Sequence, residues 1–308
     1  MLLWIPLAVG SYFFSALSQT VDKVLVSTNR LSPLAYAFYT GLFSIFPLIV
    51  FAPVGFELIP FGIFFLAFLS GAALVMALYF LYSALSSGDA SRAVPLVGGA
   101  SPIFILIFSY IFSGEVISLE EFLALFLLIV GGVLLSLEFR EKEARFNGRV
   151  VIFSLGAAFF FASSFFLSKE LFKALEEVSI SRAPFFVGFF WGRFGSLVTA
   201  FFMLCIPGVW LKIREVSRTA ERGSVSLFVI NKVIAGGGFF LLNISIYFGP
   251  VSIINAMKGL EHFFVFILTA FATSFLPHAL RESFDAHSVV VKLIGTTYIA
   301  TALVLLIA

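Results

Sequence analysis

Four polar residues lie within one apolar stretch near the end of the chain. Asn255, Lys258, Glu261 and His262 follow one another at helical spacing, so a helix would place them on one face. A lysine there would attract an anionic group, and a deep carboxylate or imidazole could exchange protons. The set indicates a lining for a solute pathway. A Lys258–Glu261 pair that neutralises itself and only holds helices together is the alternative interpretation.

Arg193 stands alone in the middle of another apolar stretch, next to Gly192. No carboxylate is near it in sequence, so its partner must come from another helix or from a solute. A planar guanidinium suits a carboxylate or a phosphate, which favours an anionic solute. A structural ion pair with Glu261 or Asp22 is the alternative, and the sequence does not choose between the two.

Further candidates lie on the first and eighth apolar stretches. Asp22 and Lys23 end the first stretch, with Gln19 on the same helical side. These residues could form a gate. The simpler interpretation is that Lys23 reaches the membrane edge beside a local counter-ion, and we interpret Lys232 in the same way. The predicted pathway residues are Arg193, Lys258, Glu261, His262, Asn255, Asn243, Asp22, Lys23 and Gln19.

Apolar helices must position these residues. Of 308 residues, 61% are hydrophobic and only 12% are charged, whereas soluble domains carry roughly 25% charged residues. Ten stretches have about the length that crosses a bilayer as a helix, and they lack the alternation of barrel strands. They are predicted at 2–27, 33–52, 61–86, 91–113, 118–138, 150–173, 184–206, 225–248, 251–275 and 288–307.

Several function classes lack their signature in this sequence. The net charge is +2 and no basic tract is present, which argues against nucleic acid as a partner. The single Cys205 excludes an intrachain disulfide and fits no cysteine-ligated metal site. No phosphate-loop, zinc or nucleophile motif appears. We therefore expect that the protein is not an enzyme and binds no cofactor. We expect transport to be driven by diffusion or by a proton or ion gradient.

The stretches form two similar halves. FFSALSQTVDKVL from Phe13 matches FFFASSFFLSKEL from Phe159 at several positions in register. The predicted units are residues 1–139, a charged linker at 140–149, and residues 150–308. Five spans per half would invert the second half, as in many transporters. The basic residues of the loops change side between the halves, and the positive-inside rule then places both termini outside the cytoplasm.

Short motifs give the chain a family resemblance. They are ALSSGDASRAVPLVGGASPIF (84–104), Ser113-Gly114-Glu115 with the glycine-rich segment 117–135, and YFGPVSIINAMKGLEHFF (247–264). In these segments the chain resembles the EamA-like family of the drug/metabolite transporter superfamily. The resemblance implies an all-α integral membrane protein of ten transmembrane helices in two inverted five-helix repeats. It also implies a small-molecule solute, a cell-membrane location, a monomer or homodimer, and cytoplasmic termini.

The sequence leaves rival functions open. A membrane receptor or assembly subunit would use the same fold without moving a solute. An intramembrane lipid-modifying enzyme is a more distant alternative.

The charge count and the family resemblance disagree on orientation, and labelling distinguishes them. With Cys205→Ser removing the native thiol, Ala144→Cys puts a single thiol in the linker REKEARFNGR. If the termini lie outside, an impermeant maleimide should label this thiol only after the cells are permeabilised. Labelling of intact cells would place the linker outside and the termini in the cytoplasm.

Overall fold

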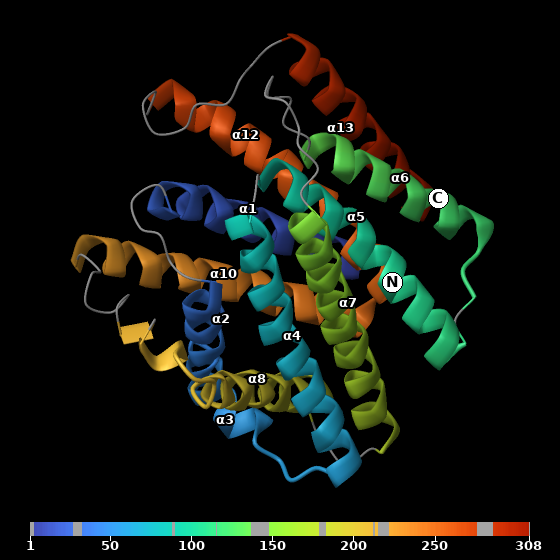
Figure 1. Ribbon diagram of the computed structural model, residues 1–308. Helices are drawn as coiled ribbons and strands as arrows, with labels where there is room; N and C mark the ends of the chain where they lie inside the picture. The colour runs from blue at the N-terminus through green and yellow to red at the C-terminus, as the bar shows by residue number, and fades with distance from the viewer. Residues whose placement is uncertain are drawn as a thin grey trace.

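The computed structural model describes residues 3–26, 33–87, 90–114, 116–136, 148–178, 183–211, 213–214, 222–275 and 286–307. These residues form helices and no strand (Figure 1). The helices are α1 (Trp4–Val26), α2 (Pro33–Leu42), α3 (Ile45–Gly55), α4 (Phe61–Ser87), α5 (Ala90–Phe108), the π-helical η1 (Ser109–Ser113), α6 (Leu119–Ser136), α7 (Gly148–Glu177), α8 (Pro184–Met203), α10 (Arg222–Phe248), α11 (Val251–Ala256), α12 (Gly259–Phe275) and α13 (Ala286–Ile307).

Each predicted apolar stretch contains helix. Three stretches are divided: the second into α2 and α3, the fourth into α5 and η1, and the ninth into α11 and α12. Within the described ranges, six segments are long and apolar enough to cross a membrane. They are Pro33–Gly55, Phe61–Ser87, Ala93–Ser113, Gly148–Glu177, Pro184–Met203 and Val229–Phe248. The all-helical, multi-span class is thus confirmed, while ten crossings and the inversion stay predictions.

The helices pair between the two halves of the chain. α1 packs against α10 and α12, and α7 packs against α4 and α5. The first helix of each half therefore contacts the third and fourth segments of the other. α6 and α13 lie side by side, green and red in Figure 1. One pairing has no equal counterpart: α4 packs closely on α8, whereas α10 makes no comparably extensive contact with α2.

Glycines allow the closest of these contacts. A Cβ on Gly71 of α4 would lie 2.2 Å from the Gly192 carbonyl oxygen and 2.4 Å from the Ser196 nitrogen of α8. Between α6 and α13, a Cβ on Gly131 would lie 2.7 Å from the Gly295 carbonyl oxygen, and the reverse distance is 2.9 Å. In lipid, where burying apolar surface between helices gives little gain, this van der Waals packing holds helices together.

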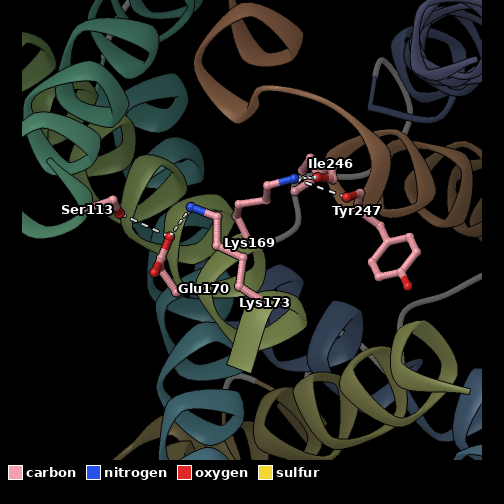
Figure 2. A network of polar contacts seen from close by, with 6 residues as sticks. All are labelled: Ser113, Lys169, Glu170, Lys173, Ile246 and Tyr247. Carbon is pink, nitrogen blue, oxygen red and sulfur yellow. Dashed lines mark hydrogen bonds and ion pairs between the residues drawn. The ribbon is translucent and has the colours of Figure 1, made fainter. Parts of the chain in front are cut away.

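A polar network ties α7 to its neighbours near their ends (Figure 2). The Lys169 ammonium donates to the carbonyls of Ile246 at 2.9 Å and Tyr247 at 3.0 Å. These carbonyls belong to the last turn of α10, which has no further turn to satisfy them. On the same helix, Glu170 accepts hydrogen bonds from Lys173 and from Ser113 at the end of η1, both at 3.0 Å. Lys169 therefore caps one helix from another.

The glycine contact predicts a position-dependent effect of one methyl group. Gly71→Ala should lower the free energy of unfolding by about 1–3 kcal/mol, because the methyl group would overlap the backbone of α8. Gly62→Ala, on the same helix with nothing within 4 Å of the added atom, is the matched control and should have no such effect. Thermal unfolding of the purified variants in detergent measures both, and equal midpoints would refute the close contact.

The cap on α10 predicts that two neighbouring lysines differ. Lys169→Met removes a charged donor from two last-turn carbonyls and should cost about 1–2 kcal/mol of stability. Lys173→Met removes a partly exposed i,i+3 ion pair and should cost less than about 0.5 kcal/mol. The same unfolding measurement applies, and a larger loss for Lys173→Met would contradict the cap.

Candidate functional site

The segment that carries the predicted polar face is broken. α11 ends at Ala256 and α12 begins at Gly259. At the break, the Lys258 amide donates to the Asn255 carbonyl at 3.1 Å, and the Glu261 amide donates to the Lys258 carbonyl at 3.0 Å. These bonds span three residues instead of the four of an α-helix. A tightened turn within a helix often marks a functional position, so the candidate site is centred here.

The break releases a carbonyl that α1 then satisfies. In an unbroken helix the Lys258 amide would donate to the Ile254 carbonyl. The Tyr12 hydroxyl donates to that carbonyl instead, at 2.7 Å. Within a bilayer an unsatisfied backbone group costs several kcal/mol. Tyr12 therefore stabilises the broken conformation and joins α1 to α11.

The two charged residues at the break contact different helices. The Gln19 side-chain amide on α1 donates to the buried Glu261 carboxylate. The Lys258 ammonium lies 5.2 Å from the centre of the Phe161 ring on α7. Across the described residues, no direct ion pair links Lys258 to Glu261. The self-neutralising lock is thus absent in its direct form, although Lys258 is near enough to act electrostatically on Glu261.

Asn255 and His262 complete the set at the break. Asn255 is buried, and its side-chain oxygen Oδ1 accepts no hydrogen bond. Lys258 and His262 border a small pocket whose other walls are formed by α5 and α6. Gly259 lies against α6 so closely that a Cβ there would be 2.7 Å from Gly132 Cα. The face predicted as one surface therefore divides, with Glu261 directed to α1 and Lys258 and His262 to the pocket.

Arg193 is buried in α8 among aromatic rings. Its guanidinium carbon Cζ lies 4.4 Å from the centre of the Phe239 ring on α10 and 5.7 Å from that of Phe189. Its Nε atom is buried without a hydrogen-bond partner. The structure shows no ion pair between Arg193 and Glu261. Of the two carboxylates that the sequence offered as partners of Arg193, this leaves Asp22.

The remaining predicted residues take other roles or lie outside the description. The Asn243 side-chain nitrogen donates to the Phe239 carbonyl of its own helix at 2.9 Å, so this donor is used within α10. The backbone of Asp22 and Lys23 belongs to α1, but their side chains lie outside the described residues. The gate and the Arg193–Asp22 pair therefore stay predictions.

Sequence reasoning did not connect Lys232 with a pair of tyrosines. The Lys232 ammonium of α10, which we expected at the membrane edge, donates to the Tyr36 hydroxyl of α2 and lies 4.3 Å from the centre of that ring. The Tyr36 and Tyr82 rings have centroids 3.8 Å apart. The cluster joins three helices, so no local sequence pattern could reveal it.

Within the part of the chain that the structure describes, no group of three or more His, Cys, Asp or Glu residues is arranged to hold a metal. What the arrangement offers is a pair of cations, a carboxylate held by an amide, and an unpaired amide oxygen at a helix break.

Comparison with known proteins agrees with this architecture. A crystal structure described only as "Crystal structure of protein" is similar to the chain with a TM-score of 0.66. The likeness covers 97% of this chain and 94% of that one at 14% identity, so it shows the fold alone. No curated protein matches the chain in sequence. The sequence model of the EamA-like transporter family matches residues 2–137. The predicted resemblance to the EamA-like transporter family is thereby confirmed over these residues.

Proposed function

We propose that the chain is a secondary transporter that carries a small metabolite across the cell membrane by alternating access. The broken helix at Met257–Lys258 is the observation that carries this proposal. Discontinuous helices expose backbone and polar groups to a solute in many transporters, and such irregular backbone is otherwise rare in a membrane. Here the break coincides with Asn255, Lys258 and Glu261 in an otherwise apolar segment.

The proposed architecture is ten crossings in two inverted five-helix repeats. Pairing between the halves supports it, because α1 with α10 and α12 corresponds to α7 with α4 and α5. The contact of α6 with α13 joins the last helices of both halves. One pair of corresponding contacts is unequal: α4 packs closely on α8, whereas α10 packs less on α2. A transporter shows this kind of difference between its two sides in any one state.

Coupling to a proton or ion gradient would use groups at the break. Glu261 is a buried carboxylate with one described hydrogen-bond donor, Gln19. Loss or gain of a proton there would change its attraction to Lys258. His262 borders the pocket beside Lys258 and offers a second titratable group.

A receptor or assembly subunit with the same fold is the rival function. It would need neither an exchangeable polar site nor a change of access. The rival therefore predicts no solute flux from a folded, reconstituted protein.

Flux from proteoliposomes tests the proposal. A panel of amino acids, organic anions and nucleotide sugars should contain at least one transported solute. For that solute, Lys258→Met and Glu261→Gln should each lower the flux about 10- to 100-fold, the usual effect of losing a hydrogen bond to a charged group.

Lys173→Met is the matched control, because this lysine lies in an outer ion pair on α7 and its loss should leave the flux unchanged. Folding of each variant is checked by size-exclusion chromatography and thermal unfolding. Full flux in both site variants would show that the helix break is not part of the solute pathway, although the protein would still be a transporter. No flux of any solute from the folded protein would favour the rival.

A further inference from the structure

A row of aromatic rings joins the buried Arg193 to the half-buried Lys258. From Arg193 the row begins at Phe239 of α10, with 4.4 Å between guanidinium carbon and ring centre. The Phe239 and Phe165 rings are 6.5 Å apart, and Phe165 and Phe161 of α7 are stacked with centroids 6.1 Å apart. Phe161 then lies 5.2 Å from the Lys258 ammonium. We call Phe239, Phe165 and Phe161 the aromatic row.

Arg193 lacks hydrogen-bond acceptors in the described structure. The residue is only 9% exposed, its Nε is buried without a partner, and no described group accepts a hydrogen bond from its guanidinium. The rings of Phe189 and Phe239 attract the charge through their faces. They do not replace the oxygen acceptors that a guanidinium with five N–H donors requires. The guanidinium therefore has donors available for an acceptor that none of the described residues supplies.

At the opposite end of the aromatic row, the cation has a carboxylate nearby. Lys258 is near the Glu261 carboxylate and is attracted to it. Arg193 has no carboxylate among the described residues, so it is the stronger site for an anion. A planar guanidinium binds a carboxylate or phosphate through two parallel hydrogen bonds.

We propose that Arg193 and the aromatic row form a subsite for an aromatic organic anion. The carboxylate or phosphate of the solute binds the guanidinium, and its flat apolar body lies along Phe239 and Phe165. A solute ammonium beside the carboxylate would be repelled by Arg193, so the subsite favours an aromatic acid over an amino acid. This inference rests on the proposed transport function for its role, but binding alone suffices to test it.

Equilibrium binding to the purified wild-type protein tests the class of solute. The probe is radiolabelled indole-3-acetate, measured by scintillation proximity in zwitterionic detergent and again in phosphatidylcholine vesicles, where no anionic lipid can occupy Arg193. Unlabelled 3-phenylpropionate should displace the probe. Its neutral analogue 3-phenylpropanol, the aliphatic anion hexanoate and the amino acid phenylalanine should each compete at least about tenfold more weakly.

Variants test the residues. Arg193→Gln should weaken probe binding about 30-fold, and Arg193→Lys about tenfold, because lysine keeps the charge but loses the bidentate geometry. Phe239→Leu should weaken it about fivefold through loss of the ring face. Phe65→Leu, which changes an exposed ring of α4 that stacks on Phe61, is the matched control and should bind normally.

The outcomes separate this inference from the proposed function. Absence of probe binding to folded wild-type protein, or normal binding by Arg193→Gln, overturns the subsite even if other solutes are transported. Binding with the expected losses, but no flux in proteoliposomes, supports the subsite and counts against transport. Equal competition by hexanoate would overturn the aromatic part of the proposal.

Discussion

The hydrogen bond from the Tyr12 hydroxyl to the Ile254 carbonyl allows the site to exist. A helix in lipid cannot be interrupted without leaving backbone groups unsatisfied, and the break at Met257–Lys258 leaves this carbonyl free. Because the Tyr12 hydroxyl donates a hydrogen bond to this carbonyl, the chain can turn at Lys258. Just after the turn Gly259 lies against Gly132, and the Glu261 and Lys258 side chains contact different helices. The bond from Tyr12 thus stabilises the backbone on which these polar groups are arranged.

Four cations within the helix bundle are stabilised in different ways. Lys169 donates to helix-end carbonyls, which carry partial negative charge. Lys232 contacts the hydroxyl and ring of Tyr36. Lys258 lies near the Phe161 ring and interacts electrostatically with the Glu261 carboxylate. Arg193 alone in this group of four has only rings as described contacts. A chain with 43 Phe residues therefore uses ring faces where a soluble protein would use carboxylates.

The sequence predicted the helical segments well, because long apolar runs bounded by Gly, Pro and charge have few other solutions in a membrane. It also singled out the charged residues of the candidate site, since charges in apolar runs are costly and therefore conspicuous, and their role stays a prediction. It could not predict the direction of each side chain. Spacing placed Glu261 with Lys258, but Glu261 accepts a hydrogen bond from Gln19 on α1, while Lys258 lies near the Phe161 ring on α7. Nor could it predict Phe161 or Tyr36 as partners, because these contacts depend on how distant helices cross.

The cap that Lys169 forms also acts on the aromatic row. Phe161, Phe165 and Lys169 follow one another at four-residue spacing on α7, while Phe239 and Ile246 lie along α10. By bonding to the end of α10, Lys169 limits how far the two helices can separate. The same bonds therefore constrain how far Phe239 can move from Phe165.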